Sequence, residues 1–397
     1  MAIAQSRSFR AAAVSAACLI ALLVFSAAGP AHARNADARP MVIFDQDAFG
    51  PGGSDMQSIL MLLQDKDIDL LGICVVTGDG WRDEEVRHTL RLLEIARRTP
   101  IPVLPGAVFP LLNTPQRTLA WERLYGKYFY DGAYMSQWPS ENTVDWTPLH
   151  PTKPYWVPPL PEGEPSIHAS SESAVGFMLR MVHRYPHQVT IIAAGPLTDL
   201  ALAAKMDPQF APLASQLVFM GGSFKPIPAD NPFAGANYNT PRREFNMKFD
   251  PEAASIVLHQ PWRRITEVPV DATNPTLMSR QLLQQVAAGQ APFDHYLGRF
   301  GQVYPLWDEA AVAVWLDPSL IKSKTTLLTD VDTSFTANYG GMLSWPVGFG
   351  PRLDERPVNV VLTLDVPKLN HLVVRLLTAA QPVSLRPVPR QGSAQAQ

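Results

Sequence analysis

Short apolar runs alternate along the chain with segments in which apolar residues recur at helical spacing. The apolar runs predict strands at residues 41–44, 70–76, 101–104, 189–193, 216–220 and 358–364. The helical spacing predicts helices at residues 55–64, 83–98, 197–205 and 368–379. This alternation is typical of βαβ units. We therefore predict an α/β fold with an open, mainly parallel (mixed) sheet and helices on both faces.

The alternation stops between residues 112 and 168, where Trp, Tyr and Pro become frequent. This segment includes Trp121, Trp138, Trp146 and Trp156. We predict an irregular insertion over the mouth of the sheet. A lid or binding loop, an oligomer contact and a plain surface excursion remain open as its role.

The two ends of the chain differ from the rest. Arg7 and Arg10 precede an apolar stretch at 11–28, which is followed by Gly-Pro and by Ala31-His32-Ala33. This pattern predicts a signal peptide at 1–33, with an uncleaved membrane anchor as the alternative. Residues 34–385 are then one domain, and 386–397 are a disordered tail because they lack core-forming residues. The mature protein is expected to be periplasmic or secreted, without a membrane segment.

The composition narrows the class of protein. The 397 residues are 46% hydrophobic and 17% charged, which indicates a globular protein and excludes a disordered or coiled-coil chain. A net charge of −3 gives no electrostatic basis for binding nucleic acid or an anionic membrane. Cys18 falls within the predicted signal peptide, so Cys74 is expected to be a buried, unpaired thiol.

The densest cluster of chemically useful residues follows the first predicted strand. Residues 42–55 read VIFDQDAFGPGGSD, so two aspartates enter a glycine-rich turn and Asp55 opens the next helix. Carboxylates at the end of a parallel strand lie where open α/β sheets bind ligands. Three acids this close favour a bound cation. The alternative is that Asp45 caps a turn and Asp55 caps the helix.

This segment resembles the N-terminal signature of the inosine-uridine-preferring nucleoside hydrolase family. Four later blocks are also similar to motifs of that family and occur in the same order. They are AGPLTDLA at 194–201, FMGG at 219–222, EFNMKFDPEAA at 244–254 and DEAAVA at 308–313. Together the five blocks span most of the predicted mature chain.

The resemblance implies a Rossmann-like nucleoside hydrolase fold, usually in a homo-oligomer. It also implies a Ca²⁺-dependent hydrolase that cleaves the N-glycosidic bond of a ribonucleoside. Asp47 would hold Ca²⁺ and take a proton from the attacking water. Asp55, the carbonyl of Thr198 and Asp308 would complete the protein ligands.

The resemblance also assigns substrate-binding residues. Glu244 and Asn246 would hold ribose hydroxyls, and Asn237 or Asn239 would supply a further asparagine. Two positions depart from the family pattern at the sugar. Ser54 replaces an acid that faces the 2′-hydroxyl, and Asp79 replaces an asparagine that follows the second strand.

A third departure concerns the leaving base. Trp307 occupies the position of a histidine that serves this base in purine-cleaving members, and an indole cannot act as a general acid. Trp307 could instead stack on the base. His295, in the helical-looking stretch at 292–300, is our candidate to replace the histidine, and Tyr296 and Tyr304 are lesser candidates.

Two other functions stay open. Ser54 and Trp307 are compatible with a non-catalytic or altered-specificity nucleoside- or sugar-binding protein of the same fold. An aspartyl-phosphate phosphohydrolase with Asp45 as its nucleophile would also begin with an apolar strand and D-x-D. That class expects Thr or Val where this chain has Ala48.

Overall fold

The computed structural model describes residues 39–137, 149–226 and 243–385. The predicted signal peptide and tail lie outside these residues. So do Asn237 and Asn239, and also Trp138 and Trp146 of the insertion. The interpretations placed on them remain predictions.

The described residues form a nine-stranded mixed sheet with the order β3-β2-β1-β4-β5-β6-β9-β7-β8. The first seven strands in this order run parallel, and β7 runs antiparallel to both β9 and β8. The strands are β1 (Met41–Gln46), β2 (Asp69–Val75), β3 (Val103–Pro105), β4 (Val189–Ala193), β5 (Gln216–Met220), β6 (Ile265–Val268), β7 (Ile321–Val331), β8 (Met342–Pro346) and β9 (Pro357–Leu364). The predicted α/β class and mainly parallel sheet are confirmed.

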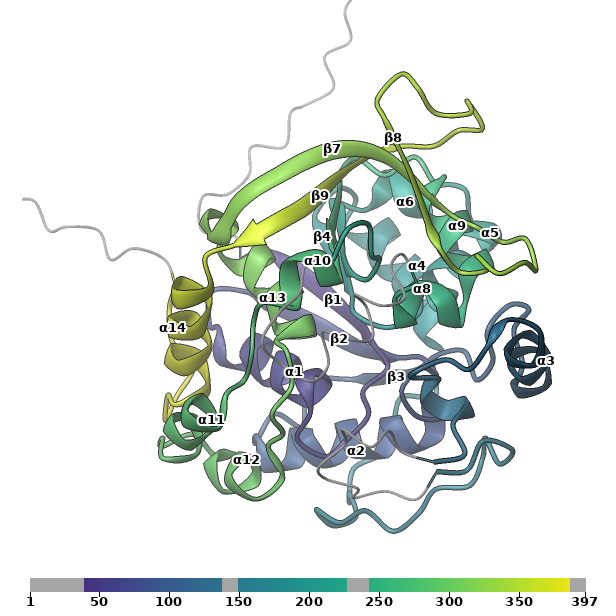
Figure 1. The fold of residues 1–397 in the computed structure, drawn as a ribbon. Coiled ribbons are helices and arrows are strands. Elements are labelled where there is room, and N and C mark those ends of the chain that lie inside the picture. Colours follow the sequence, from purple (N-terminus) through teal and green to yellow (C-terminus); the bar gives the residue numbers. More distant parts are fainter. Residues whose placement is uncertain (1–38, 138–148, 227–242, 386–397) are drawn as a thin grey trace, which may run out of the picture. The chain divides into compact units, whose positions relative to one another are not determined.

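Helices cover both faces of the sheet (Figure 1). They are α1 (Ser54–Gln64), α2 (Arg82–Ile95), α3 (Pro115–Tyr125), α4 (Ala174–Arg184), α5 (Thr198–Met206), α6 (Phe210–Leu213), α8 (Phe245–Phe249), α9 (Pro251–Leu258), α10 (Val270–Thr273), α11 (Arg280–Ala287), α12 (Asp294–Phe300), α13 (Trp307–Leu316) and α14 (Val366–Leu377), with 3₁₀ turns η1 (Gly132–Tyr134) and η2 (Pro318–Leu320). No helix among these described residues is both long and apolar enough to cross a bilayer.

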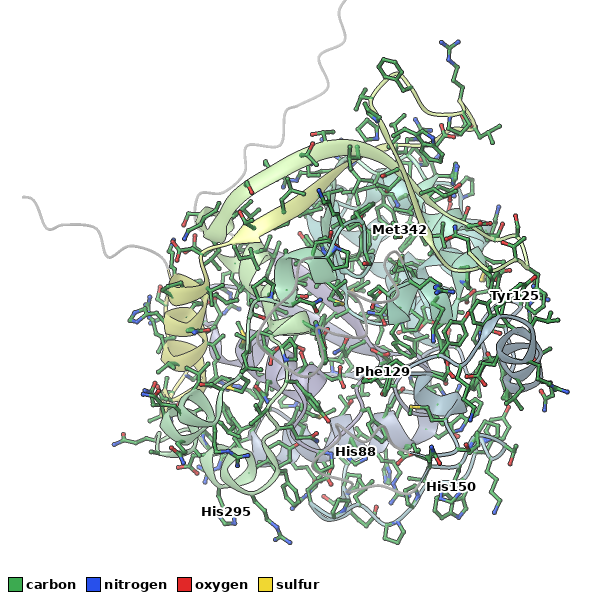
Figure 2. The ribbon with its side chains drawn as sticks, in the orientation of Figure 1. His88, Tyr125, Phe129, His150, His295 and Met342 are labelled. Atoms are coloured by element: carbon green, nitrogen blue, oxygen red, sulfur yellow. The ribbon has the colours of Figure 1, made fainter. Side chains whose placement is uncertain are left out.

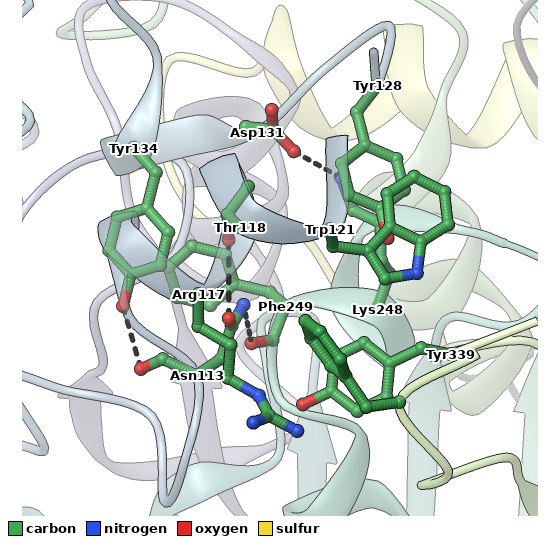
Figure 3. Close-up of a pocket in the computed structure, with 11 residues that line it drawn as sticks. Asn113, Arg117, Thr118, Trp121, Tyr128, Asp131, Tyr134, Lys248, Phe249 and Tyr339 are labelled. Atoms are coloured by element: carbon green, nitrogen blue, oxygen red, sulfur yellow. Dashed lines mark hydrogen bonds and ion pairs between the residues drawn. The ribbon is translucent and has the colours of Figure 1, made fainter. Parts of the chain in front are cut away.

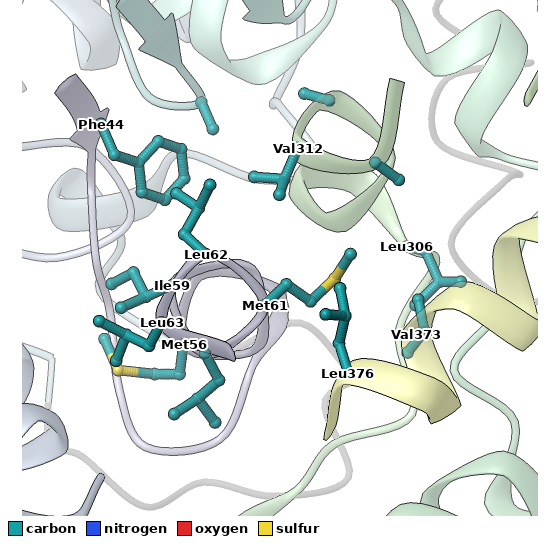
Figure 4. Close-up of a cluster of buried hydrophobic side chains, with 14 of the residues drawn as sticks. Phe44, Met56, Ile59, Met61, Leu62, Leu63, Leu306, Val312, Val373 and Leu376 are labelled. Atoms are coloured by element: carbon teal, nitrogen blue, oxygen red, sulfur yellow. The ribbon is translucent and has the colours of Figure 1, made fainter. Parts of the chain in front are cut away.

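Each face of the sheet carries its own hydrophobic core. Val42 and Phe44 of β1 join one core with α1, α2 and α11–α14, whereas Ile43 joins the other with α4, α5, α6 and α9. Successive strand residues point to opposite faces, so the apolar run of β1 serves both cores. Every residue of α1 is buried, and its side chains pack against α13 and α14 (Figure 4). This packing fixes the helix whose first turn carries Asp55.

The insertion differs from the irregular segment that we predicted. It contains α3 and the turn η1, and α3 begins where Thr114 caps the helix and Pro115 occupies its first turn. Only Thr118 and Trp121 of α3 are buried, so the helix shows little apolar periodicity. The capping residues Thr114 and Pro115 indicate the start of this helix better than its hydrophobic pattern does. Cys74, in contrast, is buried and unpaired as expected.

Candidate active site

The predicted site residues gather where the strand order reverses. β1 lies between β2 and β4, and the chain continues outward from it in both directions along the sheet. In an open α/β sheet, ligands bind at the carboxyl ends of the strands beside such a switch point. Asp47 directly follows β1, Asp79 follows β2, and Thr198 follows β4 at the start of α5. The sheet therefore brings together residues from three separate segments of the chain.

Asp47 is held in a narrow slot between two glycines. Its side chain is buried, and its Oδ2 accepts a hydrogen bond of 3.0 Å from the main-chain N–H of Asp79. A Cβ atom on Gly78 would lie 2.0 Å from Oδ2 of Asp47, and one on Gly195 would lie 2.8 Å from Oδ1. Any side chain at either position would displace this carboxylate.

Gln46 connects two of the predicted metal ligands. Its Nε2 donates hydrogen bonds of 3.0 Å to Oδ1 of Asp55 and 3.0 Å to Oδ2 of Asp308. One amide nitrogen reaches both carboxylates, so their oxygens lie close together. We did not predict this role for the middle residue of D-x-D. Strand alternation contains the signal, because Gln46 shares a face with Phe44, toward α1 and α13.

Ser54 joins the first turns of α1 and α13. Its hydroxyl donates to Oε2 of Glu309 at 2.5 Å and accepts from the main-chain N–H of Asp308 at 3.1 Å. These bonds fix Asp308 relative to α1. The predicted contact between Ser54 and the substrate would therefore compete with a bond inside the protein.

The site concentrates negative charge. Burial raises the pKa of Asp47, Asp55 and Asp308, and neighbouring carboxylates raise the pKa of Asp47 and Asp55 further. Burial, followed by the charge of Asp308, raises the pKa of Asp79 to about 8. We call these four residues the acidic cluster. Each pays a cost in solvation that a cation would offset.

The donor chemistry of the acidic cluster fits a hard divalent cation, because every side chain offers carboxylate oxygens. The bond network of Gln46 already brings the oxygens of Asp55 and Asp308 together. Among the described residues, however, no three acidic, histidine or cysteine side chains already form a metal cage. The residue types suit Ca²⁺.

Two of the similar sequence blocks meet at Thr198. Its hydroxyl donates to Oδ2 of Asp250 at 2.6 Å, and Asp250 also caps α9. The next residue, Asp199, accepts a hydrogen bond of 2.8 Å from the main-chain N–H of Ala107 and lies against the carboxyl of Asp45. Burial raises the pKa of Asp199 to about 7. These contacts fix the start of α5, where the predicted carbonyl ligand lies.

Glu244 and Asn246 anchor neighbouring strand ends. Glu244 caps α8, and its carboxylate accepts from the main-chain N–H groups of Asn246, Met247 and Gly222 at 2.9, 3.2 and 3.0 Å. Nδ2 of Asn246 donates to the carbonyls of Ala194 and Met220 at 3.0 and 3.2 Å. Their predicted ribose contacts would add to this structural role.

One comparison decides the family. The sequence model described as "Inosine-uridine preferring nucleoside hydrolase" matches residues 42–371, which include all five sequence blocks. The chain belongs to this family.

Relatives of this family member cover nearly the whole domain at low identity. It is 29% identical over 354 residues to "Probable uridine nucleosidase 2" of Arabidopsis thaliana, covering 85% of this chain and 97% of that protein. It is 26% identical over 352 residues to the "Inosine-uridine preferring nucleoside hydrolase" of Crithidia fasciculata, covering 85% and 96%.

Solved structures agree on the fold. A plant nucleoside hydrolase superposes with a TM-score of 0.65 at 23% identity, covering 86% of this chain and all (100%) of the other. A purine-preferring ribonucleoside hydrolase from Gardnerella vaginalis gives 0.63 at 20% identity, covering 85% and 98%. The predicted nucleoside hydrolase fold is confirmed for this family member.

The residues predicted to contact or protonate the leaving base lie in different environments. His295 is exposed on α12 and points outward (Figure 2), so it is not brought to the acidic cluster. Its neighbour Tyr296 is buried, and the hydroxyl accepts a 2.9 Å hydrogen bond from the main-chain N–H of Gly52. Tyr304 stacks on Trp307 with ring centroids 5.8 Å apart. Tyr304 also lies near Asp79 and Asp55, whose charges add to the effect of burial in raising its pKa.

Tyr130 is a residue near the site that our sequence analysis missed. It belongs to the insertion, and its hydroxyl interacts with the carboxyl of Asp79, which offsets part of the rise in the pKa of that carboxyl caused by burial. The carboxyls of Asp55 and Asp47 are also close enough to affect Tyr130. Nothing in the sequence distinguishes Tyr130 from the other aromatic residues of the insertion.

Proposed function

We propose that this protein is a Ca²⁺-dependent ribonucleoside hydrolase that releases ribose and the free base. The observation that carries this proposal is the acidic cluster at the switch point beside β1, in which Asp47, Asp55 and Asp308 are buried and Asp79 is half-buried. Its carboxylates come from loops after β1 and β2 and from the starts of α1 and α13. A site of this charge suits a cation and a sugar that becomes cationic in the transition state.

In this proposal Asp47, Asp55, Asp308 and the carbonyl of Thr198 would hold the cation. When bound, the cation would act as a Lewis acid that lowers the pKa of water. Asp47 takes the proton from the attacking water, while the N–H of Asp79 keeps the carboxylate oriented. The water oxygen bonds to the anomeric carbon as the bond to the base breaks, and the base leaves with that electron pair and takes up a proton that balances the one given to Asp47.

The remaining contacts hold the substrate. Glu244 and Asn246 bind ribose hydroxyls with one of Asn237 or Asn239, and Asp79 and Ser54 face the sugar. Trp307 stacks on the base. His295 would protonate that base only after a rearrangement of α12, because its side chain is exposed.

The setting of the reaction belongs to the same proposal. The predicted signal peptide places the enzyme in the periplasm or outside the cell, where it would salvage purine or pyrimidine nucleosides. We propose a homo-oligomer, as the resemblance implies.

A second candidate is a binder or a hydrolase of altered specificity. Two observations favour it: the hydroxyl of Ser54 is already bonded to Glu309, and His295 lies away from the acidic cluster. Such a protein would bind nucleosides or sugars and leave common ribonucleosides intact.

The test is release of reducing sugar by residues 34–397 from purine and pyrimidine nucleosides, with Ca²⁺ or with a chelator. We expect release that the chelator abolishes and that Asp47→Asn removes, whereas Asp83→Asn, a change on the partly exposed first turn of α2, retains it. Calorimetry with Ca²⁺ alone measures the metal site separately. Nucleoside binding without release would favour the second candidate, and neither binding nor release would contradict both.

A further inference from the structure

The insertion docks a short segment directly beside the acidic cluster. The main-chain N–H of Ala133 donates to the carbonyl of Gly78 at 2.9 Å, one residue before Asp79. Gly132 has φ +52°, and a Cβ atom there would lie 2.3 Å from that carbonyl oxygen. This approach of two backbones fixes the segment that carries Tyr130.

Lys248 holds the same segment from the other side. Its Nζ donates to the carbonyl of Tyr130 at 2.5 Å and to Oδ1 of Asp131 at 2.6 Å. Figure 3 shows the contact with Asp131. It also lies 3.7 Å from the ring centroid of Tyr128, which stacks on Trp121 at 4.2 Å. We call Lys248, Asp131, Tyr128 and Trp121 the lysine joint.

The hollow beside the lysine joint is too small to be a second ligand site. It encloses about 10 Å³, which is room for roughly one water. Asn113, Arg117 and Tyr339 line its other walls. The contacts of Lys248 with the insertion therefore anchor it and do not enclose a ligand.

The anchored segment directs the side chain of Tyr130 to Asp79. Its ring packs edge-on against Phe245 of α8, with centroids 5.0 Å apart and an interplanar angle of 69°. Its hydroxyl reaches the Asp79 carboxyl, whose main-chain N–H binds Asp47. Asp79 thus connects Tyr130 to Asp47, the proposed general base.

The chemistry of this position selects a sugar hydroxyl. A phenol has one O–H donor and oxygen lone pairs that accept, and the contact with Asp79 occupies the O–H of Tyr130. The phenol oxygen keeps its lone pairs, so a ligand group that binds it must donate a hydrogen bond. In the proposed function Asp79 faces the sugar. A sugar hydroxyl beside Asp79 can donate to Tyr130, whereas a carbonyl or an unprotonated ring nitrogen of a base only accepts.

Resting on the proposed function, we propose that Tyr130 is a specificity-determining residue that binds a sugar hydroxyl together with Asp79. Lys248 is the positioning residue that holds Tyr130 there. The sugar would then be recognised in part by the insertion, and the departures from the family pattern at Asp79 and Ser54 would be balanced by a hydrogen-bonding group from outside the sheet edge.

The main test compares Tyr130→Phe with Tyr134→Phe. Both variants lose a phenol hydroxyl from the same segment, but that of Tyr134 donates only a long 3.4 Å bond to the carbonyl of Asn113. We expect Tyr130→Phe to raise KM for uridine and inosine about tenfold, the value of one good hydrogen bond, with a smaller effect on kcat. Tyr134→Phe should leave both constants near those of the wild type.

A panel of 2′-, 3′- and 5′-deoxynucleosides identifies the hydroxyl. For the analogue that lacks it, Tyr130→Phe and the wild type should have the same KM, because the bond is already missing. Lys248→Met should raise KM in the same direction, and Lys248→Arg should restore part of the loss. Equal penalties for Tyr130→Phe on every analogue would overturn the assignment to a sugar hydroxyl.

Calorimetric binding of ribose and of the nucleosides separates this inference from the proposed function. If the wild type cleaves nucleosides and Tyr130→Phe matches it throughout, the inference fails and the function stands. If the wild type binds without cleaving and Tyr130→Phe weakens binding about tenfold, the function fails and the inference stands. Absence of any binding would overturn both.

Discussion

The acidic cluster and the lysine joint both hold charged groups away from solvent near the same end of the sheet. The lysine joint pairs opposite charges, whereas the acidic cluster places like charges together. In the lysine joint, the side chains of Lys248 and Asp131 are 6% and 14% exposed and lie 2.6 Å apart. In the acidic cluster, carboxyl groups face other carboxyl groups, and each raises the pKa of the next. One region satisfies its charges internally, and the other leaves them to be satisfied by a ligand.

This difference separates stability from function. Removing one partner of a buried ion pair leaves an unpaired charge and destabilises the fold. Removing one of several mutually repelling carboxylates relieves repulsion and removes a reactive group. Substitutions in the two regions should therefore have opposite effects on stability and activity.

The largest effect is expected for Asp47→Asn. This change removes the proposed base, and we expect kcat for nucleoside cleavage to fall about a thousandfold. In chelator, the melting temperature should stay level or rise, because repulsion with Asp79 is lost. Steady-state kinetics and thermal unfolding measure the two effects. A large drop in melting temperature with retained kcat would reverse the proposed contrast.

The next effect is expected for Lys248→Met. It leaves Asp131 without its partner and should lower the free energy of unfolding by about 3 kcal/mol. Chemical denaturation measures this loss. The double variant with Asp131→Asn should recover a large part of it, since no charge is then left unpaired. Additive losses in the double variant would show that packing, not charge, holds the joint.

A smaller effect is expected for Glu84→Gln in the first turn of α2. Burial and the charge of Glu162 raise the pKa of Glu84 to about 8 in the folded protein. The stability linked to this group is complete below the unfolded pKa, about 4.5, and is lost as the pH rises through about 8. The free energy of unfolding of Glu84→Gln should equal that of the wild type at about pH 5 and exceed it by roughly 2 kcal/mol at about pH 9.

Denaturation at several pH values measures this difference. Asp83→Asn is the control, because it removes a charge from the same turn at a partly exposed position. Parallel pH profiles for Glu84→Gln and the wild type would contradict the prediction.

The smallest effect is expected for Asp199→Asn. The folded pKa of about 7 is above the ordinary value of 3.8, so the contribution of Asp199 to stability is lost as the pH rises toward 7 and beyond. Asparagine keeps the acceptor for the N–H of Ala107 and can donate to Asp45. We expect a gain of about 1 kcal/mol at about pH 8 and little change near pH 4, measured by denaturation.

The sequence predicted the sheet best where strands are buried on both faces. β1, β4 and β5 are mostly apolar, and the structure has strands at the predicted positions, with β1 continuing through Asp45 and Gln46. β7 was missed because three exposed polar residues in a row, Lys322, Ser323 and Lys324, occupy most of its first half. α3 was missed because it buries only two side chains. Periodicity reports burial, so elements at the margin of a core escape it.

For the site, motifs predicted which residues gather but not how they bond. Asp47, Asp55, Asp79 and Asp308 come together, as expected from their places at strand and helix ends. The bonds of Gln46 to two of these acids, and of Ser54 to Glu309, depend on the distance between α1 and α13. Tyr130 depends on the docking of an insertion. Such contacts join segments that are far apart in the chain, and no local pattern encodes them.

The bond between Gln46 and Asp308 spans 262 residues and has a consequence for the order of folding. The N-terminal part of the chain contains β1, β2, β4 and the slot around Asp47, and these elements can pair before α13 exists. Asp308 arrives only when α13 docks against α1. We therefore expect the electrostatic cost of the site to fall on the last stage of folding, after most of the sheet has formed. A cation present at that stage would act as a folding partner as well as a cofactor.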